Sequence, residues 1–262
     1  MTSPTSSMSR YATYPSLTDR SVLITGGATG IGATLVREFA AQGARVGFID
    51  LDAASGEALA AELVPTSRHA PVFVHADLTD IDALQAAIAT VAAACGPILA
   101  LLNNAANDVR HSIESTTSAS WDRGVAVNLK HQFFAAQAVA PGMRAAGGGS
   151  IVNFGSISWM LKQGGMPAYT ASKAAVQGLT RGLARDLGRD NIRVNTLVPG
   201  WVMTEKQLRL WVDDAAKADI SRLQCIDQPL MPADIARMAL FLAADDSALC
   251  TAHDFQVDAG IV

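Results

Sequence analysis

Short runs of aliphatic and β-branched residues alternate along the chain with longer, alanine-rich stretches whose apolar positions recur at helical spacing. Uninterrupted apolar runs are typical of strands in a parallel sheet that helices cover on both faces. The pattern predicts strands at Val22–Thr25, Arg45–Ile49, Pro71–His75, Ile98–Leu102, Ser150–Phe154, Ile192–Val198 and Phe255–Val257. The helices predicted between them are Gly30–Ala41, Ala53–Leu63, Ile81–Ala94, Ser118–Arg144, Ala168–Gly188 and Pro232–Ala243.

This alternation of strands and helices predicts an α/β fold, and no shift in composition marks a second domain. We expect a doubly wound, seven-stranded parallel sheet with right-handed crossovers and helices on both faces. The domain is expected over residues 17–262. It follows a flexible tail, residues 1–16, that is rich in Ser, Thr and Pro and lacks the apolar run of a signal peptide. Ligands of such sheets lie beyond the carboxyl ends of the strands, so candidate chemistry is sought there.

Composition and charge exclude several classes of protein. Of the 262 residues, 50% are apolar and 17% are charged, which allows a large core and excludes a disordered chain. The 20 basic and 24 acidic residues give a net charge of −4, so we expect no nucleic-acid partner. The most apolar stretch, residues 86–102, is broken by Gly96 and Pro97, which predicts no membrane span.

The cysteines and histidines are scattered rather than clustered. Cys95, Cys225 and Cys250 form no CxxC pair and no even disulfide set, which is typical of a reducing compartment and indicates a cytoplasmic protein. The five histidines show no HExxH spacing, so we expect no catalytic metal.

The turn after the first predicted strand, residues 25–32, is rich in glycine and has the spacing G-x-x-x-G-x-G. Glycines let the backbone approach a pyrophosphate, and the following helix directs free N–H groups and its positive dipole end at it. A plain glycine-rich turn is the alternative. Asp50 ends the second predicted strand, where a carboxylate can hold both hydroxyls of an adenosine ribose and repel a 2′-phosphate. Because the turn contains no Lys or Arg, we expect NAD rather than NADP.

Two aspartates in this region have a second interpretation as helix caps. Asp50 could merely cap the helix that begins at Ala53, although Asp52 could do so instead. Asp77, after the third predicted strand, is placed either to accept a hydrogen bond from an adenine amino group or to cap the next helix.

Tyr169 and Lys173 are four residues apart in a predicted helix and so share one face. A free phenol titrates near pH ~10, too high for a base at neutral pH, but an adjacent ammonium group and the positive nicotinamide ring lower its pKa. The alternative is an incidental pair on a solvated helix. Ser156 follows the fifth predicted strand, where its hydroxyl can bond the oxygen that is oxidised.

Two further polar residues lie where such a site would need them. Asn128 is inside a predicted helix, where its amide competes with backbone hydrogen bonds, which indicates either a local bulge that holds water or an exposed side chain. Thr204 comes soon after Pro199-Gly200 at the end of the sixth predicted strand, where its hydroxyl can reach a carboxamide.

Together with Asn103-Asn104-Ala105, these motifs occur in the order and at the spacing of the short-chain dehydrogenase/reductase superfamily, which the chain resembles over residues 17–262. The resemblance implies a single-domain Rossmann fold and a homotetramer. It also implies that Tyr169 is the acid/base and that Lys173 lowers the pKa of Tyr169 and holds the nicotinamide ribose. Ser156 would orient the substrate, and Asn128 would anchor a water in a proton relay.

The same resemblance implies where NAD binds. Asn104 would line the cofactor groove, and the complete set of expected cofactor-binding residues is Gly26, Thr29, Gly30, Ile31, Gly32, Asp50, Asp77, Leu78, Asn104, Tyr169, Lys173, Pro199, Gly200, Val202 and Thr204. The family usually has Gly where this chain has Ala106, so we expect the added methyl group to crowd the turn under the adenosine.

Residues 103–111, 137–143 and 153–159 are similar to bacterial aldose 1-dehydrogenases that act on D-xylose. Such enzymes oxidise the anomeric hydroxyl of an aldose to a lactone. Residues 160–168 depart from their pattern, so the substrate could be a pentose, a 6-deoxyhexose or a hexose. The expected substrate-binding residues are Asn107, Ser156, Trp159, Gln163, Tyr169 and Trp201. Core aromatics and solvated amides are the alternative for the tryptophans and the amides.

Three other interpretations stay open. Residues 200–228 are expected to form a lid, and Arg110 and His111 either support the site or lie on the surface. The same scaffold also serves reductases of 3-oxoacyl thioesters or other ketones. A non-catalytic, NAD(H)-binding regulator is the alternative from another class, against which the presence of the Tyr169–Lys173 pair argues.

Overall fold

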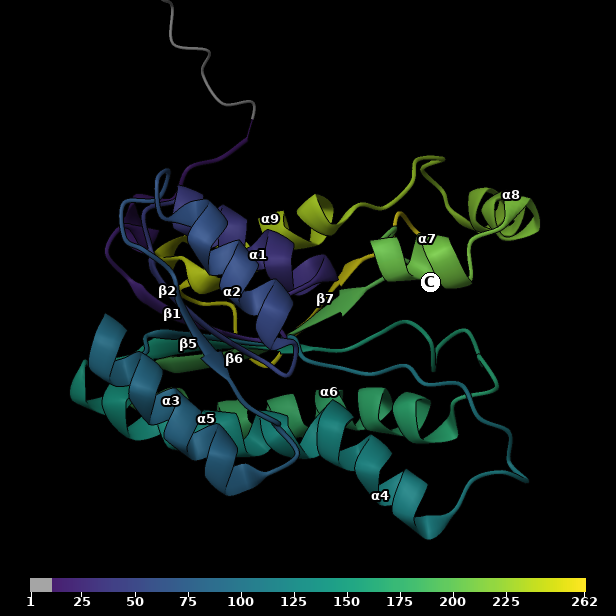
Figure 1. The fold of residues 1–262 in the computed structure, drawn as a ribbon, viewed down its shortest axis with the longest axis horizontal. Coiled ribbons are helices and arrows are strands. Elements are labelled where there is room, and N and C mark those ends of the chain that lie inside the picture. The colour runs from purple at the N-terminus through teal and green to yellow at the C-terminus, as the bar shows by residue number, and fades with distance from the viewer. Residues whose placement is uncertain (1–10) are drawn as a thin grey trace, which may run out of the picture.

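In this computed structural model, which describes residues 11–262, seven strands form one parallel sheet (Figure 1). The strand order is β3-β2-β1-β4-β5-β6-β7. Successive strands are therefore added on one side of β1 up to β3, and on its other side from β4 onward. The strands are β1 (Ser21–Thr25), β2 (Arg45–Asp50), β3 (Val72–His75), β4 (Ala100–Asn103), β5 (Gly149–Phe154), β6 (Ile192–Pro199) and β7 (Asp254–Val257). The predicted doubly wound parallel sheet is confirmed.

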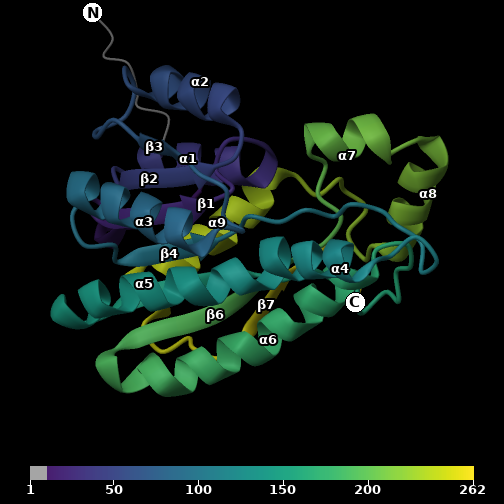
Figure 2. The same ribbon diagram turned by 60° about the horizontal axis from the view of Figure 1, so that its bottom comes forward.

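Helices cover both faces of the sheet (Figures 1 and 2). One face carries α1 (Gly30–Ala41), α2 (Ala53–Leu63) and α9 (Pro232–Ala243). The other carries α3 (Ile81–Cys95), α5 (His131–Ala145) and α6 (Pro167–Leu187). Each face therefore has its own apolar core, and every residue of the central strands β1 and β4 is buried between the two.

Seven further helical segments complete the described chain: α4 (Ser118–Val125), α7 (Glu205–Leu210), α8 (Asp214–Leu223), a π-helix at Ala126–Lys130, and 3-10 turns at Pro15–Leu17, Gly188–Asp190 and Asp245–Ser247. α7 and α8 fall in the segment that we expected as a lid, and they project beyond the carboxyl ends of the strands (Figure 1). The predicted continuous helix Ser118–Arg144 is wrong in one respect, because the π-helix interrupts it.

The start of the domain lies earlier than the sequence pattern predicts. Residues 11–16 were expected in the tail, but the Tyr14 amide donates to Gln42 Oε1 at 2.8 Å and the Asp245 amide donates to Ser16 Oγ at 3.1 Å. Residues 11–16 therefore pack on the domain, while residues 1–10 of the expected tail lie outside the described residues. Within residues 11–262, none of the helices has the length and apolar character needed to cross a membrane.

Candidate active site

The glycine turn between β1 and α1 is built for close backbone approach. Gly26 and Gly30 have φ angles of +66° and +56°, which L side chains rarely adopt. A Cβ on Gly32 would lie 1.7 Å from the carbonyl oxygen of Gly26, so α1 can begin against the turn only with glycine there. In the described chain no side chain caps α1, because Thr29 at the N-cap makes no side-chain hydrogen bond. The first turn of α1 therefore suits an anion.

Asp50 faces this turn and does not cap a helix. Its Oδ2 accepts from the Ala28 amide at 2.8 Å and its Oδ1 accepts from the Asp52 amide at 3.0 Å. Asp52 caps α2 by accepting from the Ser55 amide at 3.0 Å. The capping interpretation of Asp50 is thus wrong, and its carboxylate is held at the glycine turn, where a ribose is expected.

Asp77 does not cap a helix either, because Asp80 caps α3. Instead, Asp77 Oδ1 accepts from the amide of Thr79 at 2.9 Å and from its hydroxyl at 2.8 Å. The adjacent Leu78 is buried. Contact of Asp77 with an adenine stays a prediction.

The other expected cofactor residues gather around the glycine turn. Asn104 Nδ2 donates to the carbonyl oxygen of Gly26 at 2.8 Å, so this amide fixes the turn itself. Thr204 caps α7, and its methyl group would lie 3.4 Å from a Cβ on Gly30. Thr204 is thereby next to Gly30, although 174 positions separate them in the sequence.

Three expected cofactor residues line the end of β6. Pro199 is buried as the last residue of the strand, and Gly200 donates its amide to Val257 O at 2.9 Å. Val202 forms an isolated parallel bridge with Leu230. These contacts fix the chain path that leads from β6 to Thr204. Ala106, which stands where the family usually has glycine, is exposed, and its φ is not positive. Its backbone therefore lacks the strain that an alanine suffers at a positive φ.

Tyr169 and Lys173 lie on one face of α6, as predicted. Lys173 is buried, its Nζ donates to Phe154 O at 2.7 Å at the end of β5, and the same Nζ lies 5.7 Å from the Tyr169 ring centroid. Ser156 acts to lower the pKa of the Tyr169 phenol, and its Oγ accepts from the Ser158 amide at 3.1 Å. The interpretation of an incidental pair on a solvated helix is therefore wrong.

The proton affinities of this pair differ from the sequence-based expectation. Burial raises the pKa of Tyr169 to about 12, while its hydrogen bond with Ser156 acts in the opposite direction. Burial also lowers the pKa of Lys173 to about 7, so its ammonium group is only partly charged at neutral pH. Desolvation thus outweighs the lowering of the Tyr169 pKa that the sequence analysis expected from Lys173.

Asn128 occupies the π-helix, which confirms the interpretation as a local bulge and excludes the exposed one. The side chain is 1% exposed and clamps the segment after β4 from both sides. Its Oδ1 accepts from the Asn107 amide at 2.9 Å, and its Nδ2 donates to Asn107 O at 3.0 Å and to Gly124 O at 2.9 Å. The Asn128 amide thus fixes the backbone of an expected substrate-binding residue, while the Asn107 side chain is exposed.

A chain of buried polar groups ties the carboxyl ends of β4, β5 and β6 together behind this site. Asn103 Nδ2 donates to Asn153 Oδ1 at 2.9 Å, and Asn153 Nδ2 donates to Thr180 Oγ1 at 3.0 Å. Thr196 Oγ1 bonds the same Thr180 hydroxyl at 2.9 Å. This network holds α6, and with it Tyr169 and Lys173, at a fixed position over the sheet.

His131 is a fully buried histidine that sequence analysis did not single out. Among the described residues, neither ring nitrogen has a hydrogen-bond partner within ordinary distance. Burial, followed by the charge of Lys173, lowers the pKa of His131 to about 3. The folded protein therefore keeps this ring neutral down to about pH 3, whereas the unfolded chain protonates it near its ordinary pKa.

We expect His131→Leu to flatten the pH dependence of stability. A pKa lowered from its ordinary value near 6.5 gives the folded state stability that is fully present above pH ~6.5 and is lost as the pH falls toward 3. On acidification from pH 7 to 4.5, the wild-type protein should lose about 2.5 kcal/mol through this residue, and His131→Leu should lose none of it. Urea unfolding at both pH values measures this, with the exposed His75→Leu as the control. An equal loss in His131→Leu and wild type would contradict the assignment.

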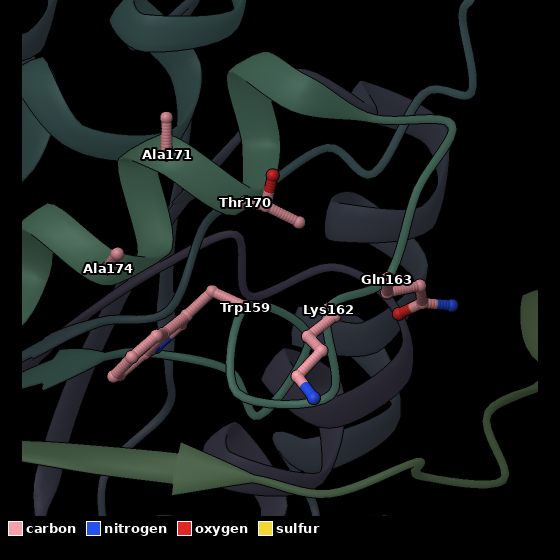
Figure 3. A pocket seen from close by; sticks show the side chains of 6 residues that line it. All are labelled: Trp159, Lys162, Gln163, Thr170, Ala171 and Ala174. Carbon is pink, nitrogen blue, oxygen red and sulfur yellow. The ribbon is translucent and has the colours of Figure 1, made fainter.

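Trp159 and Gln163 line a pocket of ≈ 290 Å³ with Lys162, Thr170, Ala171 and Ala174 (Figure 3). By helical geometry, Ala174 is about 140° around α6 from Tyr169, so this pocket opens on another side of the helix. The reason is a turn in the preceding segment, in which Gln163 donates its amide to Ser158 O at 3.0 Å and Lys162 has a φ of +56°. These two residues are therefore not carried into the proposed substrate site.

Charged residues that the sequence analysis missed meet between the segment after β4 and α7. Asp108 Oδ1 accepts from Lys206 Nζ at 2.6 Å, and Oδ2 accepts from Gln207 Nε2 at 3.0 Å. Gln207 Oε1 accepts from the indole of Trp201 at 3.0 Å. Asp108 follows β4 and Lys206 follows β6, and the carboxyl ends of these parallel strands lie at the same edge of the sheet. Their opposite charges could therefore have predicted this contact from the sequence.

The remaining candidates differ in their surroundings. The Arg110 guanidinium lies 5.0 Å from the centroid of the Trp211 ring, and the His111 amide donates to Gly165 O at 2.8 Å. Both residues thus have contacts within the chain, and a role of either in the site stays a prediction. The part of the chain that the structure describes contains no group of three or more His, Cys, Asp or Glu side chains placed to hold a metal ion.

Known proteins resemble this chain over nearly its whole length. Residues 26–262 match a family model described as enoyl-(acyl carrier protein) reductase. A probable galactose dehydrogenase of Rhizobium meliloti is 46% identical over 95% of this chain and 97% of its own. A D-xylose 1-dehydrogenase of Caulobacter vibrioides is 45% identical over 95% and 98%. A short-chain type dehydrogenase/reductase of Mycobacterium ulcerans superposes with a TM-score of 0.89 at 26% identity, covering 95% and 91% of the two chains.

Proposed function

The chain belongs to the short-chain dehydrogenase/reductase family, and from this premise we propose that it oxidises the anomeric hydroxyl of an aldose to the lactone with NAD. The observation that carries the proposal is the assembly of Ser156, Tyr169 and Lys173 at the same sheet edge as the glycine turn and Asp50. The names of the sugar dehydrogenases that the chain resembles support the substrate class.

The residues at the glycine turn fit NAD. A turn that only glycine can form meets an uncapped helix start, which suits a pyrophosphate. Asp50 presents a carboxylate that suits ribose hydroxyls and disfavours the 2′-phosphate of NADP. When bound, NAD supplies a hydride acceptor and a positive charge.

In the proposed reaction, Tyr169 Oη takes the proton of the anomeric hydroxyl. Ser156, whose hydroxyl acts to lower the pKa of the phenol, holds the substrate oxygen in line with it. Lys173, fixed by Phe154 O, adds its positive charge beside the phenol and favours the phenolate. Asn128 fixes the segment after β4 and supports a relay that returns the proton to solvent.

Trp201 and Asn107 are the sequence-predicted sugar contacts that we retain. The Trp201 indole is oriented by Gln207, and the Asn107 backbone is clamped by Asn128. An apolar indole face suits sugar C–H groups, and an amide suits ring hydroxyls. We also retain the homotetramer and the cytoplasm as proposals from the family.

The proposal is tested by a screen of NADH production with pentoses, 6-deoxyhexoses and hexoses, beside NADPH oxidation with a 3-oxoacyl thioester. D-xylose and D-galactose are the first substrates, since the resembling dehydrogenases are named for them. We expect turnover with at least one aldose and a kcat/KM for NAD well above that for NADP. Thioester reduction without sugar oxidation would favour the reductase alternative. NAD binding without turnover of any compound would favour the regulator.

A further inference from the structure

Asp108 joins two segments that the sequence places far apart. It follows β4, and both of its carboxylate oxygens accept from α7: Oδ1 from Lys206 Nζ at 2.6 Å and Oδ2 from Gln207 Nε2 at 3.0 Å. The Asp108 side chain is 18% exposed, whereas that of Lys206 is 49% exposed. The carboxylate is thus held at the edge of the core, and its positive partner reaches it from the surface.

Gln207 connects this carboxylate to Trp201. Its Nε2 donates to Asp108 Oδ2, and its Oε1 accepts from Trp201 Nε1 at 3.0 Å. An indole nitrogen only donates and an ionised carboxylate only accepts, so the Gln207 amide fits between them in one orientation. We call these two hydrogen bonds the Gln207 bridge. Because the bridge has a fixed direction, it ties one edge of the indole to the segment after β4.

The Gln207 bridge gives the Trp201 ring its direction. The ring packs against an apolar cluster around α7 and α8 that consists of Met203, Val212 and Ile220. Apolar packing is non-directional, so it holds the ring in place without fixing the angle of its face. A hydrogen bond is directional, and the bond to Gln207 Oε1 therefore sets that angle.

Backbone contacts place both ends of the Gln207 bridge at the proposed site. The amide of Ile157, the residue after Ser156, donates to Pro199 O at 3.3 Å. Trp201 follows only two positions later, so it leaves the end of β6 beside this segment. At the other end, the π-helix holds the residue that precedes Asp108 by two hydrogen bonds. The bridge thus spans the two segments that we retained as sugar contacts.

We propose that Asp108 and Gln207 are positioning residues for the sugar, which set the angle at which Trp201 presents its indole face. A face held at one angle can lie along the C–H groups of a sugar ring, whereas a mobile face must first be ordered. Neither residue belongs to the expected cofactor set, so the effect should fall on the sugar rather than on NAD. The effect on the sugar rests on the proposed function, but the orientation of Trp201 is measurable without a substrate.

The first test is acrylamide quenching of Trp201 fluorescence, taken as the difference between each protein and its own Trp201→Phe counterpart. Gln207→Glu sets a second carboxylate against Asp108, and this repulsion should break the bridge and raise the quenching constant of Trp201 about twofold. Gln207→Met removes both hydrogen bonds without adding a charge and should have the same effect. This second variant keeps the test valid if Gln207→Glu folds poorly.

The double variant Asp108→Asn/Gln207→Glu exchanges the donor and the acceptor of the bridge. The introduced asparagine donates to the introduced glutamate, and that glutamate still accepts from Trp201 and leaves one carboxylate beside Lys206. The quenching constant of Trp201 should therefore return to the wild-type value. A residue that only filled space would not be rescued in this way.

The second test compares KM for the sugar with KM for NAD. With an aldose that is turned over, Gln207→Glu and Gln207→Met should raise the KM of the sugar about tenfold and leave the KM of NAD within about twofold. The double variant should restore the KM of the sugar. The control is Gln85→Glu, which makes the same change at an exposed position of α3 and should alter neither constant.

Unchanged quenching in both Gln207 variants would overturn the proposal, because Trp201 would then be held without the bridge. Equal rises in KM for the sugar and for NAD would indicate general damage and would also overturn it. Rescue of the quenching without rescue of the sugar KM would show that Asp108 contacts the sugar directly, against the positioning role. If no sugar is turned over, the proposed function fails, and the quenching alone decides whether Asp108 and Gln207 position Trp201.

Discussion

Tyr169→Phe is expected to lower kcat for sugar oxidation by on the order of 10³-fold while NADH binding stays within about threefold. The phenol is the proposed base, and Lys173 Nζ lies over its ring, so removal of one oxygen atom removes the proton acceptor without removing packing. Steady-state assays with the best aldose measure kcat, and fluorescence titration measures NADH binding.

Tyr14→Phe is the matched control. Tyr14 is partly buried near the start of the domain, where its backbone amide bonds Gln42, and it lies outside the proposed site. We expect its kcat to equal that of the wild type. A Tyr169→Phe protein that retained the wild-type kcat would show that another group removes the proton, and the proposed mechanism would then be abandoned.

Gly32→Ala is expected to destabilise the fold by about 3 kcal/mol and to abolish measurable NAD binding. The new Cβ would lie 1.7 Å from the carbonyl oxygen of Gly26 and 2.8 Å from Asn104 Nδ2. Because the first of these neighbours is backbone, relief requires α1 to move away from the turn, which destroys the proposed pyrophosphate site. Urea unfolding and isothermal titration calorimetry with NAD measure the two effects.

Gly182→Ala, in contrast, should raise the free energy of unfolding. Gly182 lies inside α6, and a Cβ there would meet nothing within 4 Å. Replacement of an unhindered helical glycine by alanine stabilises a helix by roughly 0.5–1 kcal/mol. Loss of stability in Gly182→Ala, or unchanged NAD binding in Gly32→Ala, would contradict this account of the glycines.

The sheet was predictable because its signals are local. Uninterrupted apolar runs such as Val22–Thr25 identify strands whose two faces are both covered, and β1 is fully buried in the structure. The spacing of Tyr169 and Lys173 fixes their shared helical face before any tertiary contact forms. The glycine spacing of residues 26–32 likewise needs only the requirement for close backbone approach.

Where two local interpretations competed, only tertiary structure decided between them. Asp50 and Asp77 are sequence neighbours of helix starts, yet Asp52 and Asp80 are the caps. From the sequence, Asn128 could lie either in a helical bulge or exposed on the surface. Its hydrogen bond with Asn107, 21 positions earlier, holds it buried in the π-helix. Trp159 and Gln163 follow Ser156 closely in the sequence, and folding places both in a pocket with Thr170, Ala171 and Ala174 of α6.

By itself, then, the sequence determined the order of strands and helices, the glycine turn and the catalytic face of α6, since each depends on residues within a few positions of one another. Tertiary structure alone decided the pairing of Asp108 with Lys206, 98 positions away, the burial of Lys173 and His131, and the desolvation of the half-buried Tyr169. The physical reason is that proton affinity depends on desolvation and on charges brought close by folding, neither of which is encoded in local spacing.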